Sequence, residues 1–110
     1  MMLPLSAQSE PVLRHVVCFK FKPETSPAQI AEVEAAFIAL KAKIPSISAL
    51  EWGTNVSPEK HDKGFTHCFL LTFKSAADRD AYLPHPEHKK FGTLLRPVVE
   101  DVFVVDYVAQ

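Results

Sequence analysis

Histidine and tyrosine are the residues of this sequence best suited to acid/base chemistry, because imidazole titrates near neutral pH without help. His88 and Tyr82 lie six residues apart, on either side of a Pro84-His85-Pro86 break. A neutral His88 near the start of a helix could act as a general base, and the Tyr82 hydroxyl could stabilise an enolate. A helix cap at His88 and plain packing of Tyr82 explain the same residues without chemistry.

Two further histidines lie within strongly apolar segments. His15 and His67 share the side of their predicted strands that carries bulky apolar residues, so both should point toward a covered face. Two imidazoles there could hold or shuttle a proton. The alternative is that each is a buried structural histidine bonded to a backbone carbonyl.

The sequence predicts neither a metal nor a nucleotide cofactor. His85 and His88 are spaced for a shared metal, but no third ligand follows at a clear spacing, and His61 lies in a polar loop. Three glycines in the whole chain give no glycine-rich phosphate loop. Cofactor-free chemistry is therefore expected.

Two cysteines in 110 residues are too few for a disulfide scaffold. Cys18 and Cys68 share parity on two predicted strands, so they could lie close together. We expect two reduced, buried thiols that behave as small hydrophobic side chains. A nucleophilic role is not expected, since the sequence places no base beside them.

Length and charge narrow the class of protein. The chain has 110 residues, the size of one domain, and 12 basic against 13 acidic residues give a net charge of −1. A nucleic-acid-binding protein would carry a basic excess. No stretch suits a membrane span or a signal peptide, which predicts a cytoplasmic protein with a flexible leader over residues 1–11 and a domain over 12–109.

Hydrophobic periodicity predicts the order β-α-β-β-α-α-β. The strands are expected over residues 12–22, 47–56, 65–74 and 99–108, and the helices over 26–44, 75–83 and 87–96. Ser26, Pro27 and Gln29 form the start signal of the first helix. This order predicts an α+β, ferredoxin-like, four-stranded antiparallel sheet with helices on one face.

The sheet face away from the helices is predicted to be apolar, which is unusual for a protein that stands alone. We therefore expect a homodimer whose sheets pack face to face, with cover by the leader as the alternative. The residues assigned to this interface are Val16, Cys18, Leu50, Trp52, Cys68, Leu70, Val102 and Val104.

Several segments together resemble the stress-responsive dimeric α/β-barrel (Dabb) family, over about residues 13–107. The marks are a histidine in the first strand, the GFTH opening of the third, the YLPHPEH segment and the closing VDY. The resemblance implies a ferredoxin-like unit that dimerises through its sheets. The family's plant members include stress-induced proteins and a cofactor-free polyketide cyclase. The resemblance implies that the function of this protein is related to theirs.

On that resemblance, His88 is the base, Tyr82 its partner, and His15 and His67 the strand histidines of a pocket between sheet and helices. The family's cyclase has a pocket-lining tyrosine in the first helix, where this chain has Phe37 or a neighbour. The pocket would take a small aromatic or polyketide-like molecule for a cyclase or lyase step. There are three alternatives. The protein could be a non-catalytic binding or stress-response protein, or a structural dimer whose cavity is filled by phenylalanines 19, 21, 69 and 73. By fold analogy, it could be a cofactor-free monooxygenase.

Overall fold

A computed structural model describes residues 11–110, and the predicted leader lies outside them except for Pro11. In chain order the elements are β1 (Leu13–Phe21), α2 (Pro27–Lys43), β2 (Ala49–Thr54), β3 (His67–Phe73), α3 (Ala76–Tyr82), α4 (Pro86–Leu95) and β4 (Val99–Val108). This is the predicted order, with shorter second and third strands and a longer loop between them. In this part of the chain no helix is both long and apolar enough to cross a membrane.

Local sequence signals set the helix boundaries. Ser26 caps α2, its side chain accepting from the Gln29 backbone while the Gln29 side chain accepts from the Ser26 backbone. Ser75 caps α3 by accepting from the backbone of Asp78, without the reciprocal bond of a capping box. At α4 the capping residue is His85, whose Nδ1 accepts from the Glu87 backbone. His88 is therefore inside the helix and is not its cap.

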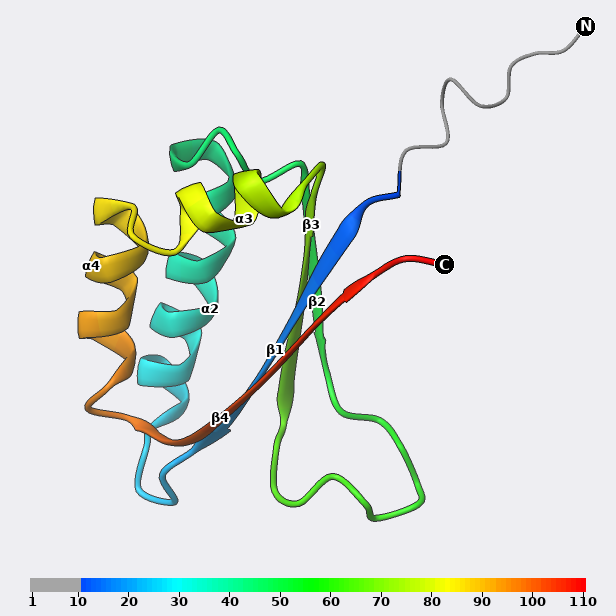
Figure 1. The fold of residues 1–110 in the computed structure, drawn as a ribbon. Coiled ribbons are helices and arrows are strands. Elements are labelled where there is room, and N and C mark those ends of the chain that lie inside the picture. The colour runs from blue at the N-terminus through cyan, green and yellow to red at the C-terminus, as the bar shows by residue number, and fades with distance from the viewer. Residues whose placement is uncertain (1–10) are drawn as a thin grey trace, which may run out of the picture.

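The four strands form one antiparallel sheet in the order β2-β3-β1-β4. All three helices lie on one side of it, with α2 beside α4 and α3 across one end (Figure 1). This is the ferredoxin-like architecture that the element order predicts.

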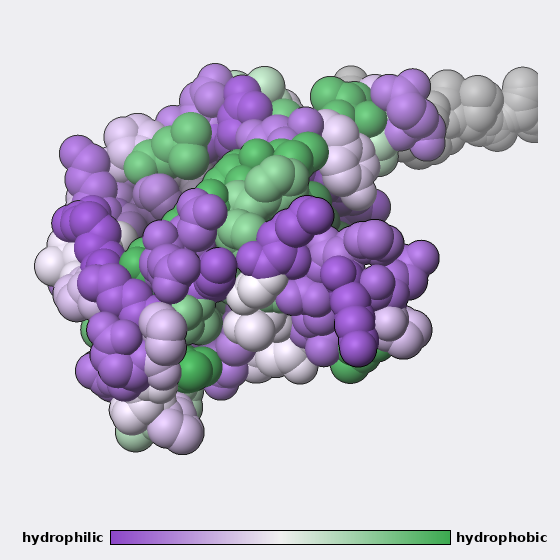
Figure 2. All heavy atoms as spheres, turned by 90° about the horizontal axis from the view of Figure 1, so that it is seen from below, coloured by the Kyte–Doolittle hydropathy of each residue, from purple (hydrophilic) through white to green (hydrophobic). Residues whose placement is uncertain are grey.

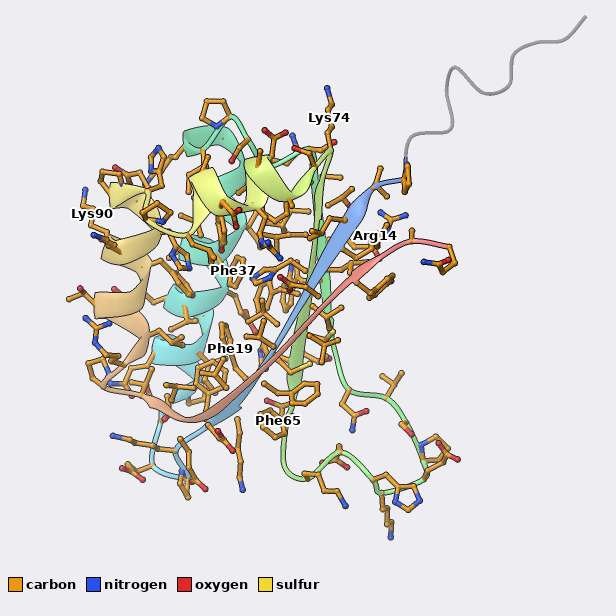
Figure 3. The ribbon with its side chains drawn as sticks, in the orientation of Figure 1. Arg14, Phe19, Phe37, Phe65, Lys74 and Lys90 are labelled. Atoms are coloured by element: carbon orange, nitrogen blue, oxygen red, sulfur yellow. The ribbon has the colours of Figure 1, made fainter. Side chains whose placement is uncertain are left out.

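The core lies between sheet and helices, and aromatic rings fill its middle. Phe19 and Phe37 point into this layer from β1 and α2 (Figure 3). Phe37 stacks on Phe69 with ring centroids 4.1 Å apart, and Phe91 of α4 meets Phe37 at 4.8 Å. Phe19, Phe37 and Phe69 are at most 2% exposed. Packed aromatic rings therefore occupy the centre of the space in which the sequence predicts a pocket.

Cross-strand register shows which residues share a side of the sheet, because directly opposed residues point the same way. Trp52 opposes Phe69 and Leu50 opposes Leu71, so both point toward the helices. Val102 opposes Phe19 and Val104 opposes Val17, with the same consequence. The assignment of these four residues to the outer face was therefore wrong. Parity within a strand does not reveal its register against a neighbour.

The outer face is nevertheless apolar, as predicted. Val16, Cys18, Cys68 and Leu70 lie on it, and β4 adds Phe103, Val105 and Tyr107, each between 42% and 51% exposed. From below, hydrophobic surface gathers between hydrophilic regions to either side (Figure 2).

The β2–β3 loop turns the outer face into a hollow. It leaves the body of the protein beyond the ends of β2 and β3 (Figure 1), and Phe65 at its end meets Phe103 with ring centroids 6.2 Å apart. The hollow has a volume of about 690 Å³, and its lining includes Val16, Cys18, Cys68, Leu70 and Phe103.

Candidate functional site

Three charged or titratable side chains meet where β1 and β4 pair. His15 and Asp106 are opposed in the register, and His15 Nδ1 lies 2.6 Å from Asp106 Oδ1. A carboxylate can only accept, so Nδ1 of His15 carries the proton and donates it. Arg79 of α3 donates to the other Asp106 oxygen at 3.0 Å. Asp106 thus holds an imidazole and a guanidinium at one end of the sheet.

Tyr82 joins this group to His88. Its ring lies 5.8 Å from the His15 ring and 4.4 Å from the His88 ring, measured between centroids. Tyr82 is 1% exposed and His15 is 5% exposed, whereas His88 is half-buried. The structure therefore brings together three of the four predicted catalytic residues.

The His88 ring has a defined tautomer and a shifted titration. Its Nδ1 lies 2.9 Å from the Leu83 carbonyl, which can only accept, so Nδ1 donates and Nε2 is left with the lone pair. Burial lowers the pKa of His88 from its ordinary 6.5, and the nearby His15 and His85 lower it further, against the Leu83 hydrogen bond. The predicted direction is the one found, but burial is the largest cause. His88 is neutral at pH 7, with Nε2 able to take a proton.

Tyr82, in contrast, is held in its protonated form. Burial raises the pKa of its hydroxyl above the ordinary value of 10.0. The phenol therefore stays protonated throughout the physiological range and is available as a hydrogen-bond donor. A neutral imidazole beside a protonated phenol can remove one proton and stabilise the oxyanion that results.

His67 is separate from this group. It opposes Phe19, four residues along β1 from His15, which corresponds to about 13 Å of extended strand. Its Nε2 donates to Glu34 of α2 at 2.7 Å, and its Nδ1 lies 2.8 Å from the Thr66 hydroxyl. Trp52 stacks on its ring with centroids 5.9 Å apart. The prediction that His67 belongs to the same pocket as His88 is not supported by this placement.

Sequence reasoning missed Asp106, Arg79 and Glu34. The Asp106 carboxylate could have been suspected, since it is the one charged residue of the apolar run over residues 102–108, in the closing VDY segment. Arg79 and Glu34 lie on helices rich in charged residues, and nothing in the sequence separates them from their solvent-facing neighbours.

The Asp106 cluster continues into exposed apolar surface. Val102 and Val104 share the helix-facing side of β4 with Asp106, yet they are 42% and 49% exposed because β4 is an edge strand beyond the helices. Neither the hollow of the outer face nor the smaller groove between α2 and α4 is lined by His15, Tyr82 or His88. His88 itself is half-buried and meets solvent, and this strip of β4 is exposed apolar surface on the same side of the sheet.

The architecture and the buried histidine–tyrosine cluster define a ferredoxin-like α+β domain with potential for acid/base chemistry. Residues 13–109 match the family model described as the stress responsive A/B barrel domain. The chain belongs to that family, as its sequence motifs predicted.

Plant proteins are prominent among its relatives. The chain is 35% identical to the stress-response A/B barrel domain-containing protein HS1 of Arabidopsis thaliana, over 86% of this chain and 87% of that protein. It is 32% identical to olivetolic acid cyclase of Cannabis sativa, over 86% of this chain and 94% of the cyclase.

Solved structures confirm the fold. A hydroxynitrile lyase from Passiflora edulis superposes with a TM-score of 0.85 at 29% identity, covering 92% of this chain and 95% of the lyase. A Bacteroides fragilis protein described as dimeric, with a ferredoxin-like fold, has a TM-score of 0.72 at 28% identity, covering 89% of this chain and 96% of that protein.

Proposed function

We propose that this protein binds a small aromatic or polyketide-like molecule beside the Asp106 cluster and catalyses a cofactor-free proton transfer on it, of the cyclase or lyase type. The observation that carries the proposal is the contact of Tyr82 with both His15 and His88. Relatives named as a cyclase and a hydroxynitrile lyase support this class of reaction.

In the proposed mechanism, Nε2 of His88 removes a proton from carbon or oxygen of the bound molecule. The Tyr82 hydroxyl donates to the oxygen on which charge develops. Asp106 fixes the ring of His15 and stabilises it if it gains a proton. The apolar part of the molecule lies on Val102 and Val104, where it covers surface that the monomer leaves in water.

Binding is tested by NMR titration of the histidine ring protons with phenolic acids, β-keto compounds and hydroxynitriles. A bound molecule should shift the resonances of His88 and His15 and leave those of His67 and the loop residue His61 unchanged. Shifts confined to His67, or none across the panel, would overturn the proposed site.

Turnover is tested with the same compounds in wild-type protein and in His88→Gln, with His61→Gln as the control. A molecule that binds wild-type protein without being converted would identify a binding protein. The packed rings of Phe37 and Phe69 leave little room to enclose a substrate, which favours a third outcome, a structural dimer that neither binds nor converts these compounds.

We also propose that the protein is a homodimer through its outer sheet face. The exposed apolar residues Phe103, Val105 and Tyr107 support this, as does a dimeric relative of the same fold. Val105→Asp should produce monomers in size-exclusion chromatography with light scattering. Val56→Asp, in the loop and already 90% exposed, is the control and should remain dimeric. A monomeric wild-type protein would refute the dimer.

A further inference from the structure

We infer that Cys18 and Cys68 form a thiol pair that closes to an intrachain disulfide under peroxide. They are directly opposed on β1 and β3, both are free thiols, and both line the hollow of the outer face. The inference concerns a different side of the sheet from the proposed catalytic cluster and does not depend on it.

The strand register places the two residues at a favourable type of position. In an antiparallel pair, opposed residues alternate between hydrogen-bonded and non-hydrogen-bonded positions, and the second kind brings Cα atoms to about 4.5 Å. Asn55 donates its backbone N–H to the carbonyl of Thr66, so that carbonyl faces β2. Backbone groups alternate in direction along a strand, so those of Cys68, two residues further along, also face β2. Ala109 donates to Val12, so the same alternation along β1 directs those of Cys18 toward β4.

Cys18 and Cys68 therefore form a non-hydrogen-bonded pair. The hydrogen bonds of β3 and those of β1 lead to this conclusion independently. The corresponding Cα separation falls within the range of about 4.4–6.8 Å that disulfides span. The neighbouring Cys68 thiol is among the groups that raise the pKa of Cys18. Closing the bond needs no change of register or strand position.

The two thiols are not equivalent, and this suggests an order of events. Cys68 is exposed, whereas Cys18 is half-buried, and burial followed by the Cys68 contact raises the Cys18 pKa to about 11. The Cys68 thiolate attacks hydrogen peroxide, which breaks the O–O bond and leaves a sulfenic acid and one water. The Cys18 sulfur then attacks the Cys68 sulfur, the S–O bond breaks, and a second water leaves with the Cys18 proton. Two thiols are oxidised by two electrons and one peroxide is reduced.

The proposed dimer would turn the same face toward a second copy. Because both sulfurs belong to one chain, the bond itself needs no partner. Cover by a second copy would limit only how fast peroxide reaches Cys68, and a failure of the dimer proposal would leave this one standing. Hydrogen peroxide is the reagent we propose because it is small enough to enter the hollow.

The test uses the folded full chain, treated with hydrogen peroxide, quenched by alkylation and then unfolded for thiol counting. Wild-type protein should lose both thiols, keep monomer mobility on a non-reducing denaturing gel, and regain both thiols with dithiothreitol. Trypsin should release the peptides spanning residues 15–20 and 64–74 joined as one species. Cys18→Ser should instead carry an overoxidised or interchain-linked Cys68, and Cys68→Ser should react least.

Two results would overturn the inference. In one, wild-type protein retains both thiols at a peroxide concentration that modifies Cys68 in the Cys18→Ser variant. Retention of both thiols at every peroxide concentration that leaves the protein folded counts equally. In the other, wild-type protein forms disulfides only between chains.

Discussion

Two histidine–carboxylate pairs lie on the same side of this sheet, and they differ in what surrounds them. His15 bonds to Asp106 at 2.6 Å and His67 bonds to Glu34 at 2.7 Å, and both rings are nearly inaccessible. The first pair has a second imidazole and a phenol beside it and borders exposed valines. The second has Trp52 stacked on its ring. A buried histidine with a carboxylate partner is thus not by itself a sign of catalysis. The side chains around the pair determine whether it can take part in a reaction.

The largest expected effect separates His88 from His67. His88→Gln should reduce kcat/KM by about 100-fold to 10,000-fold, the usual contribution of a general base. His67→Gln should change it by less than about threefold, since His67 is about 13 Å along the strand from the cluster. Steady-state kinetics on any compound that the protein converts measures both. Equal losses in the two variants would remove the distinction between the pairs.

The next effect compares the two carboxylates. Asp106→Asn should lower kcat/KM by up to about 100-fold, because His15 and Arg79 lose the group that positions them. It should also cost about 1.5–3 kcal/mol of stability, the range for a hydrogen bond to a charged group.

Glu34→Gln is the matched change at the other pair. It should cost about 1 kcal/mol of stability, measured by urea unfolding, and leave kcat/KM unaltered. An activity loss in Glu34→Gln as large as that in Asp106→Asn would contradict the assignment.

A smaller effect lies in the pH dependence of kcat/KM. Because burial lowers the pKa of His88, its base form persists as the pH falls, and the acidic limb should have its midpoint below 6.5. Because burial raises the pKa of Tyr82, ionisation of that phenol should cause no loss below pH 10. An acidic midpoint above 6.5 would assign the essential base to another group.

The smallest effect concerns Trp52, the ring that covers His67. Trp52→Phe should reduce stability by about 1 kcal/mol through loss of stacking and buried area, with no change in kcat/KM. If this variant instead gained activity at His67, the covering ring would be what distinguishes the two pairs.

The sequence was sufficient to predict the order of elements, the ferredoxin-like sheet and the helix starts at Ser26 and Ser75. These depend on local signals, namely alternation, helical spacing and capping side chains. It was insufficient for the sides taken by Trp52, Val102 and Val104, since these depend on how a strand aligns with its neighbour. The grouping of His15 with His88 but not with His67 depends on the same alignment, which sets His67 opposite Phe19 and not opposite His15.

The irregularity between β1 and β4 has a consequence for deletion variants. Lys20 opposes Asp101 while Phe21 opposes Val99, so β4 contains one additional residue at this point, Glu100. That residue allows Val99 to pack on the core while Val102, Val104 and Asp106 also point to the helix side. Deleting Glu100 would remove the irregularity and leave the rest of β4 in register, because Val99 would stay opposite Phe21 and Asp101 opposite Lys20. Deleting Phe103, in the regular part of β4, would instead turn the Asp106 carboxylate away from His15 and bring Val105 to the helix side.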